Sequence, residues 1–335
     1  MTTYYRPVPR SDAPRPENAL PLAGGPLWFS EVVALARNGN AEHISPSDVP
    51  PETLDRLTAP RAPIAGLDMT RPTLMGILNV TPDSFSDGGR YTDVANAEAQ
   101  ARAMVEAGAG LIDIGGESTR PGAETVDVAE EIRRVSAPIA AVSKLGMPVS
   151  IDTRKAPVAK AAVAAGAVIV NDVAGFTYDA DLAPLCASHQ TPVCVMHAQG
   201  DPQTMQDAPQ YEDVRFDVYD FLEERVSYLE SLGLSRSQIM IDPGIGFGKT
   251  IDHNLALLRD LSLYHGIGCP ILLGASRKKF IGVLSGADIA DTRMPGSVAV
   301  ALHAARQGVQ VIRVHDVLET RQALALWRAI DLGDT

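Results

Sequence analysis

From Thr73 onward, short apolar runs of about five residues recur along the chain, and each is followed by a polar or glycine-rich stretch. Within a run the apolar residues are continuous and do not alternate with polar ones. Continuous apolar strands are buried on both faces, which is typical of a parallel sheet. The pattern predicts eight strands, at residues 74–79, 110–114, 148–152, 167–171, 192–196, 238–242, 270–274 and 309–313.

Helical patterns fill the segments between these runs. In residues 211–233, apolar side chains that include Val214, Val218 and Phe221 share one face at the spacing of an α-helix. Glycine readily adopts the left-handed conformation that ends many helices, so the glycines before the next apolar run are predicted helix ends. They are Gly108, Gly146, Gly166, Gly233, Gly266 and Gly308.

The alternation of eight strands with eight helical segments over about 260 residues matches a (β/α)8 barrel, the TIM barrel of the α/β class. An open, doubly wound parallel sheet is the structural alternative, and the number of strands favours the barrel. We predict that the barrel spans residues 71–335 and that residues 1–70 form an N-terminal extension.

The extension differs in composition from the rest of the chain, because eleven of the 24 prolines fall in the first 70 residues. Residues 1–24 are predicted to be an extended arm, Leu27–Ala36 a short helix, and residues 64–72 a connector. No chemical motif lies in this region, which predicts a packing appendage or a tail.

The net charge limits the classes of function that the chain can have. With 29 Lys+Arg and 41 Asp+Glu, the formal charge is −12, which disfavours a nucleic-acid-binding protein but allows an anionic substrate held by a few local cations. The three cysteines have no CxxC spacing, which favours a reducing compartment and offers no zinc site. The longest apolar stretch, Ala161–Val170, is too short to span a membrane, and no secretory signal is visible. We therefore expect a cytoplasmic protein without membrane partners.

Polar residues follow nearly every predicted strand. One aspartate at such a place is usually the N-cap of the next helix. In a barrel, however, the carboxyl ends of all the strands meet at one face, where the active sites of this fold lie. The pattern therefore favours an enzyme over a binding scaffold. The residues are Asn79, Asp113, Glu117 to Arg120, Asp152, Asn171, His197, Asp242, Ser276 to Lys278, Arg313 and His315.

Familiar catalytic motifs are missing from the sequence. The segment 242–250 resembles a phosphate-binding P-loop, but position 243 is proline where that motif requires glycine. Its glycines follow GxGxG spacing and so do not match the dinucleotide fingerprint either. The sequence contains no HExxH and no GxSxG motif, which gives little support to a metalloprotease or a serine hydrolase.

The residue types at the strand ends indicate two kinds of ligand group. Asp152, Asn171 and Asp242 offer acceptors and an amide to a flat heterocycle that forms hydrogen bonds. Cationic donors for a diphosphate or a carboxylate come from Lys278, Arg313 and His315. The amide oxygen of Asn79 suits Mg²⁺, which uses few protein ligands when a substrate diphosphate supplies the others.

These segments resemble, in order, the motif series of the dihydropteroate synthase family. The resemblance covers residues 73–317, and its first and sixth motifs are highly specific. The matching segments are MGILNVTPDSFSDGG (75–89), DIGGESTRPGA (113–123), SIDTRK (150–155), IVNDVAG (169–175), VMHAQGDPQTMQ (195–206), IDPGIGFGKTIDHN (241–254), GASRKKFIG (274–282) and IRVHDV (312–317).

The resemblance implies a homodimeric (β/α)8 barrel of folate biosynthesis and a target of sulfonamides. Its members join 6-hydroxymethyl-7,8-dihydropterin diphosphate to 4-aminobenzoate and release pyrophosphate, with Mg²⁺ as the cofactor. Both substrates are small molecules.

The same resemblance assigns a role to each matching residue. The pterin ring would lie against Asp152, Asn171, Asp242 and Lys278. Asn79 would hold Mg²⁺, while Arg313 and His315 would bind the diphosphate and, with Lys278, act in catalysis. The 4-aminobenzoate pocket would be formed by Thr119, Arg120, Pro121 and Phe247. One position departs from the family pattern, because Lys279 stands where a serine often lies beside the benzoate carboxylate.

Two other functions remain as alternatives. A corrinoid-dependent methyltransferase that binds pterins would share the barrel and the Asp/Asn set, but it needs no site for a diphosphate and a carboxylate. The cations of residues 276–278 and 313–315 therefore argue against it. A barrel that acts only as a scaffold would not need the full set of polar loop residues.

Overall fold

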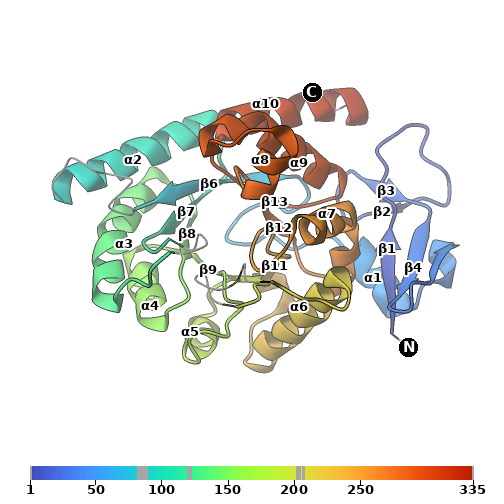
Figure 1. The fold of residues 1–335 in the computed structure, drawn as a ribbon, viewed down its shortest axis with the longest axis horizontal. Helices are drawn as coiled ribbons and strands as arrows, with labels where there is room; N and C mark the ends of the chain where they lie inside the picture. The colour runs from blue at the N-terminus through green and yellow to red at the C-terminus, as the bar shows by residue number, and fades with distance from the viewer. Residues whose placement is uncertain (1, 81–89, 119–122, 201–204, 206–207, 334–335) are drawn as a thin grey trace.

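An eight-stranded parallel barrel forms the centre of the molecule (Figure 1). The computed structural model describes residues 2–80, 90–118, 123–200, 205 and 208–333. The strands pair in chain order, and β13 returns to pair with β6. The barrel strands are β6 (Thr73–Asn79), β7 (Leu111–Gly115), β8 (Val149–Asp152), β9 (Ile169–Asp172), β10 (Val193–Met196), β11 (Ile239–Asp242), β12 (Leu272–Gly274) and β13 (Val311–Val314).

A single parallel bridge between Ile241 and Ile271 closes the barrel between β11 and β12. The amide of Ile241 donates to the carbonyl of Pro270 at 3.0 Å. The sheet is therefore closed, which confirms the predicted barrel and excludes the open, doubly wound alternative. All eight predicted strands are present, each within two residues of its predicted start.

Helices surround the barrel and cover its outer face (Figure 1). The seventh unit contributes two of them, α8 and α9, and the predicted amphipathic helix of residues 211–233 is α6. The helices of the barrel domain are α2 (Arg90–Ala107), α3 (Val128–Val142), α4 (Ala156–Ala165), α5 (Leu182–His189), α6 (Val214–Ser231), α7 (Ile251–Arg259), α8 (Lys279–Ser285), α9 (Met294–Arg306) and α10 (Val317–Trp327).

The predicted glycine helix ends are confirmed at five of six positions. Gly166, for example, has φ = +116° and ends α4. The prediction for Gly266 is wrong, because this residue lies inside the 3₁₀ helix Leu261–Ile267 and Gly268, with φ = +85°, ends that helix instead. The pattern of apolar runs could not separate two glycines two residues apart.

The N-terminal extension is built mostly from short strands. Strands β1 (Thr3–Pro7), β4 (Val32–Ala36) and β5 (Ala41–Ile44) form an antiparallel sheet, and β2 (Leu20–Pro21) pairs with β3 (Trp28–Phe29). The helix predicted at Leu27–Ala36 is therefore wrong. Its valines and leucine pack on both faces of β4, and β-branched residues favour such a strand. A 3₁₀ turn (Pro46–Asp48) and α1 (Pro51–Thr58) follow.

This extension packs against the outside of the barrel beside α6 (Figure 1). The ring of Tyr4 stacks on Phe216 of α6, with the ring centroids 4.2 Å apart. The Tyr4 hydroxyl donates to Asp220, and Arg37 pairs with Asp217 at 2.6 Å and with Asp220 at 2.7 Å. Both apolar packing and ion pairs therefore attach the extension to the barrel.

The end of the extension closes the bottom of the barrel, which is the end at which the strands begin. Ile64 and Leu67 exchange backbone hydrogen bonds of 3.3 and 2.8 Å in a tight turn. Ile64, Leu67 and Met69 belong to the same buried cluster as the inward-facing residues of the barrel, among them Met75 and Met240. We call residues 64–69 the barrel plug.

We predict that the plug stabilises the folded barrel. A chain that begins at Arg71 would expose the barrel interior and lose three buried side chains, each worth roughly 1.5–3 kcal/mol. A chain that begins at Ala62 would keep them. We expect the longer chain to have the higher melting temperature in circular dichroism, and equal melting temperatures would contradict the proposed role of the plug.

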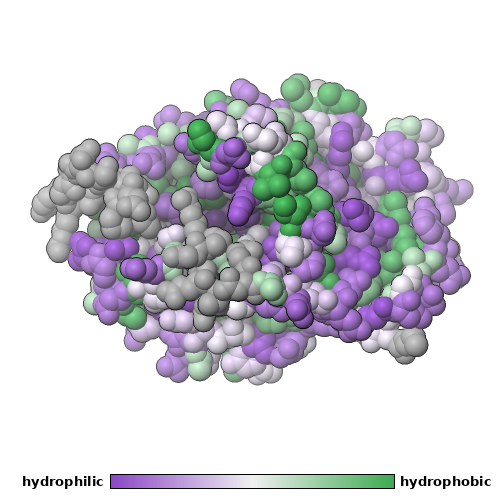
Figure 2. Space-filling view, viewed as in Figure 1, coloured by the Kyte–Doolittle hydropathy of each residue, from purple (hydrophilic) through white to green (hydrophobic). Residues whose placement is uncertain are grey.

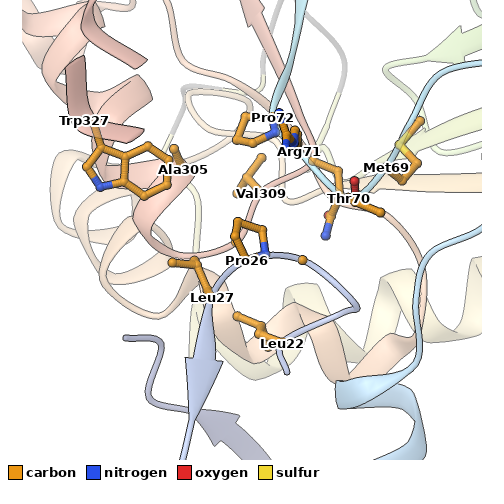
Figure 3. Close-up of a pocket in the computed structure, with 13 residues that line it drawn as sticks. Leu22, Pro26, Leu27, Met69, Thr70, Arg71, Pro72, Ala305, Val309 and Trp327 are labelled. Carbon is orange, nitrogen blue, oxygen red and sulfur yellow. The ribbon is translucent and has the colours of Figure 1, made fainter. Parts of the chain in front are cut away.

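A cavity of about 20 Å³ lies where the extension meets the bottom of the barrel (Figure 3). Leu22, Leu27, Val309 and Trp327 contribute apolar side chains to its wall. Its volume suits about one water molecule. Pro72 and Val309 precede β6 and β13, so the cavity lies at the opposite end of the strands from the polar residues predicted to form the site. It is a packing gap.

Candidate active site

Arg313 connects the ends of three barrel strands. Its Nε donates to Asp113 Oδ2 at 2.6 Å, and one terminal nitrogen donates to Asp152 Oδ2 at 3.0 Å. The amide of Asn171 also donates to Asp113 Oδ2, at 3.3 Å. Three residues predicted from the sequence, Asp152, Asn171 and Arg313, are therefore brought together from β8, β9 and β13.

Two carboxylate oxygens in this group lack a hydrogen-bond donor among the described residues. Asp113 Oδ1 and Asp152 Oδ1 are buried and have no hydrogen-bond partner among the residues that the structure describes. A buried acceptor without a donor is costly, so a ligand with N–H groups would be favoured here. The sequence indicates Asp113 only as a polar residue at a strand end, and its position between Arg313 and Asn171 depends on the closed barrel.

Burial controls the protonation of this group. Burial, together with the negative charge of Asp113, raises the pKa of Asp152 to about 7, although Arg313 opposes the shift. Burial also raises the pKa of Asp242, opposed by Lys278 and by the hydrogen bond from the Gly244 amide. The pKa of Lys278 is lowered to about 7, again mainly by burial. The pKa values of Asp152 and Lys278 therefore both lie near neutral pH, as is common in active sites.

A glycine-rich loop after β11 presents Asp242 and Phe247. The amide of Gly244 donates to Asp242 Oδ1 at 2.7 Å. Gly244 has φ = +70°, and a Cβ on it would collide with the carbonyl oxygen of His197, so only glycine fits. Lys278 Nζ donates to the carbonyl of Ile245 and lies 4.3 Å from the centre of the Phe247 ring. The predicted residues Asp242, Phe247 and Lys278 thus share one wall.

His315 lies at the start of the loop that follows β13. The Oγ of Ser276 contacts the backbone nitrogen of His315 at 3.2 Å and its Nδ1 at 3.0 Å. Ser276 and Lys278 both belong to the loop after β12, so this loop contacts two parts of the site.

Asn79 is the predicted magnesium ligand and ends β6, beside Gly115 of β7. Among the described residues, no group of three or more His, Cys, Asp or Glu side chains could hold a metal ion. One amide oxygen at the rim suits a Mg²⁺ ion that takes its other ligands from water and a substrate diphosphate. The amide oxygen of Asn79 fits such an ion.

A second buried network lies beside the site and had not been predicted. Lys155 Nζ lies 2.6 Å from Glu117 Oε2 and 2.7 Å from Glu131 Oε2. Glu117 also accepts a hydrogen bond from the amide of Val126 at 2.7 Å, so the network ties residue 117 to residue 126. The sequence signal was present, since charged residues directly follow β8 in the segment 152–155. The predicted site residues Thr119 and Arg120 lie outside the described residues, as does Pro121.

Lys249 and His197 form another buried contact that sequence reasoning missed. Lys249 Nζ lies 2.9 Å from His197 Nδ1 and donates to the carbonyl of Phe247 at 3.0 Å. Burial lowers the pKa values of both side chains. The contact holds the glycine-rich loop against the end of β10.

Asp152 provides a test of these electrostatics. Its pKa rises from 3.8 in the unfolded chain to about 7 in the folded protein, so the folded state binds the extra proton between these pH values. Its contribution to folding stability therefore falls as the pH rises through this range. Replacing Asp152 with Asn removes the effect, and we expect Asp152→Asn to melt at a higher temperature than the wild type at pH 8, with a smaller difference at pH 5.

Calorimetric melting curves at both pH values would measure this difference. Asp252→Asn, in the exposed first turn of α7, is the matched control and should show no such change. A difference that is equal at pH 5 and pH 8 would contradict the assigned protonation of Asp152.

The comparisons with known proteins agree with this geometry. The family described as "Pterin binding enzyme" matches residues 75–315. The chain is 44% identical over 264 residues to the dihydropteroate synthase of Escherichia coli K12, which covers 78% of this chain and 93% of that protein. It is 44% identical over 263 residues to the dihydropteroate synthase of Synechocystis, with 77% and 91% covered.

Solved structures show the same relationship. The Yersinia pestis dihydropteroate synthase, solved with a sulfonamide drug, has a TM-score of 0.75 and 43% identity and covers 80% of this chain and 98% of its own. The Xanthomonas albilineans enzyme, solved with 4-aminobenzoic acid, has a TM-score of 0.75 and 46% identity, with 79% and 96% covered.

The relatives named here are synthases, which favours the predicted synthase over the corrinoid-dependent methyltransferase. No helix in the described part of the chain is long and apolar enough to cross a membrane. The shared family, the closed barrel and the polar residues at its rim lead to one conclusion: the chain belongs to the dihydropteroate synthases, within the family of pterin-binding enzymes.

Proposed function

We propose that this chain condenses 6-hydroxymethyl-7,8-dihydropterin diphosphate with 4-aminobenzoate, and that the residues around Arg313 bind the reacting groups. The observation that carries these roles is the position of Arg313, which pairs with two buried carboxylates whose other oxygens have no hydrogen-bond partner among the described residues. Such a group can bind a heterocycle rich in N–H donors on one side and still present a cation to an anionic leaving group.

The pterin ring is proposed to lie between β8, β9 and β11. Its N–H groups would donate to Asp152 Oδ1 and Asp242 Oδ2, and the Asn171 amide would complete the edge. Gly274 lies beside this carboxylate, since a Cβ there would be 3.6 Å from Asp242 Oδ2, at ordinary van der Waals distance. Lys278 would contact the ring from the wall that it shares with Asp242 and Phe247.

The diphosphate is proposed to bind Arg313 and His315. In the reaction, the bond between the exocyclic carbon and the diphosphate oxygen breaks, and pyrophosphate leaves with the electron pair. The amine of 4-aminobenzoate then forms the new C–N bond and loses a proton. Arg313, His315 and Lys278 would stabilise the negative charge that develops on the leaving group. The arylamine is itself a competent nucleophile, so the chain needs no covalent intermediate.

Asn79 would hold Mg²⁺ through its amide oxygen. When bound, the ion would neutralise part of the diphosphate charge. Arg313 and His315 remain the groups of this chain that orient the leaving group.

The 4-aminobenzoate is proposed to bind beside Phe247, with Thr119 and Arg120 completing its pocket. Phe247 is half-buried, and its ring faces the site next to Lys278. The family's serine is replaced by Lys279, whose side chain is exposed. At this position the chain therefore has no side-chain hydroxyl that could contact the benzoate carboxylate.

A pyrophosphate-release assay tests the function. With both substrates and Mg²⁺, we expect release of pyrophosphate and formation of 7,8-dihydropteroate in equal amounts. Omission of 4-aminobenzoate should abolish the product. Absence of pyrophosphate release by well-folded protein with both substrates present would contradict the proposal.

We also propose that the chain forms a homodimer through its C-terminal helix. Leu318 and Leu326 of α10 and Ile330 of the π-helical segment Arg328–Leu332 that continues it are exposed, with 65% exposure at Leu326 and 78% at Ile330. Figure 2 shows the hydrophobic surface over the end of this helix. A second copy is the proposed occupant because a helical stripe can pack on itself about a two-fold axis, as the family resemblance implies.

Light scattering of the purified protein should give twice the chain mass of 35.6 kDa. Ile330→Glu should shift the mass toward that of one chain without unfolding it. A single-chain mass for the wild type would contradict the dimer.

We further propose a cytoplasmic location, which agrees with the three buried, unpaired cysteines. Fractionation of the source cells would test this location.

A further inference from the structure

Arg277 adopts a backbone conformation that arginine rarely takes. Its φ is +58°, in the left-handed region that favours glycine. It stands between Ser276 and Lys278 in a turn between β12 and α8, which the amide of Lys278 closes by donating to the carbonyl of Ala275 at 3.3 Å. The third position of such a turn is normally glycine or asparagine when its φ is positive. The surrounding structure must therefore hold Arg277 in place.

The arginine side chain provides one set of restraints. Nε and one terminal nitrogen donate to the two oxygens of Asp316, at 3.0 and 2.6 Å, so the pair is bidentate. The other terminal nitrogen pairs with Asp291. Asp316 directly precedes α10 and follows His315, so Arg277 joins the loop after β12 to the loop after β13.

The Arg277 backbone is restrained by α9 and the residue before it. Its amide donates to Ser297 Oγ at 2.8 Å, and Arg293 donates to its carbonyl at 3.0 Å. Ser297 is buried and in turn donates to the Arg293 carbonyl at 2.9 Å. Both backbone polar groups of the strained residue are therefore satisfied by side chains.

The two neighbours of Arg277 both face the site. On one side, Ser276 Oγ contacts the backbone nitrogen and Nδ1 of His315. On the other side, Lys278 donates to the Ile245 carbonyl and lies over the Phe247 ring. The turn at Arg277 sets the directions of both neighbouring side chains. A regular right-handed conformation at this residue would change the direction of the chain between them.

We propose that Arg277 is a positioning residue for the reaction. Its bidentate pair with Asp316 holds Arg277 in the left-handed conformation, and the resulting turn of residues 275–278 places Lys278 at the pterin ring and the Ser276–His315 pair at the diphosphate. The inference rests on the proposed function, since it assigns to Arg277 the orientation of residues that bind the pterin diphosphate.

The test compares two substitutions that both remove the pair with Asp316. Arg277→Ala also disfavours the left-handed backbone, whereas Arg277→Gly permits it. Misplacement of catalytic groups by about 1 Å can lower a rate by about a hundredfold, so we expect Arg277→Ala to lower kcat by about ten- to hundredfold. We expect Arg277→Gly to recover most of this loss, although both variants lack the same side chain.

A third variant tests the contribution of Asp316, the partner of Arg277. Asp316→Asn keeps Arg277 but weakens the charged bidentate pair, and we expect a smaller fall in kcat than in Arg277→Ala. Combining Asp316→Asn with Arg277→Ala should lower kcat no further than Arg277→Ala does, because residues that act as a pair are not additive. Arg306→Ala, which breaks the exposed pair with Asp331, is the matched control and should keep wild-type kcat.

Three outcomes would overturn the proposal. One is wild-type kcat in Arg277→Ala. Another is a loss in Arg277→Gly equal to that in Arg277→Ala, because backbone conformation would then not be the cause. The third is a fall in kcat across the variants that only follows their melting temperatures, which would indicate a general loss of folding. Pyrophosphate release by the wild type tests the proposed function separately, so failure of the assay in the wild type is distinguishable from failure of this inference.

Discussion

Asp242→Asn is expected to weaken binding of the pterin about ten- to hundredfold. The reason lies in the hydrogen bond from the Gly244 amide to Asp242 Oδ1, at 2.7 Å. In the variant, that amide requires the oxygen of Asn, so the NH₂ group must point into the site. A donor would then face the donors of the pterin. Loss of a charge-assisted pair of this kind is worth roughly 1.5–3 kcal/mol.

Isothermal titration with a 6-hydroxymethylpterin would measure this loss. Asp252→Asn, on the exposed first turn of α7, makes the same chemical change outside the site and should leave the affinity unchanged. If Asp242→Asn binds the pterin as tightly as the wild type, the assignment of Asp242 to the pterin ring is wrong.

Arg313→Met is expected to abolish activity and to destabilise the fold most strongly at high pH. The substitution removes the cation that pairs with Asp113 at 2.6 Å and with Asp152 at 3.0 Å. Breaking a buried pair by removing one partner typically costs about 3–5 kcal/mol, because the remaining charge is uncompensated.

The pH dependence follows from the pKa of Asp152. Arg313 now lowers this pKa, so its removal would raise it further above about 7. Below that pKa the carboxyl takes up a proton and the penalty is relieved; above it the penalty is complete. The loss in melting temperature relative to the wild type should therefore be larger at pH 8.5 than at pH 5.5.

Thermal melts at the two pH values measure this effect, and Arg313→Lys is the informative companion. Lysine keeps the charge but lacks the two-pronged geometry of guanidinium. It should recover part of the stability at pH 8.5 and little of the activity. An equal loss at both pH values in Arg313→Met would show that ionisation of Asp152 does not control the loss of stability.

The positions of the barrel strands could be read from the sequence because the signal is local. Strands buried on both faces require continuous apolar runs, and all eight runs are strands in the structure. The same logic failed in the extension. Val32, Val33 and Leu35 also suit a helix when only their spacing is considered, and they became a strand because Tyr4, Phe216 and Leu263 cover one face.

The residues at the strand ends were also visible in the sequence, since polar groups there have no reason to exist in a core. Their partners were not. Asp113 accepts from Arg313, which is 200 positions away in the chain, and nothing in either segment specifies that contact. The Arg277 turn was hidden in the same way, because arginine carries no signal for a positive φ.

The sequence by itself thus determined the strand order, the class of the fold and the residue types at the rim. The apolar pattern that marks a buried strand extends over only a few neighbouring residues, so it can be seen in the sequence. The resemblance to the synthases covers those same segments. Only the tertiary structure decided which polar groups meet, which carboxylate oxygens lack a partner among the described residues, and how far burial moves the pKa values of Asp152 and Lys278. Those properties depend on distance and desolvation, and they exist only once the barrel has closed.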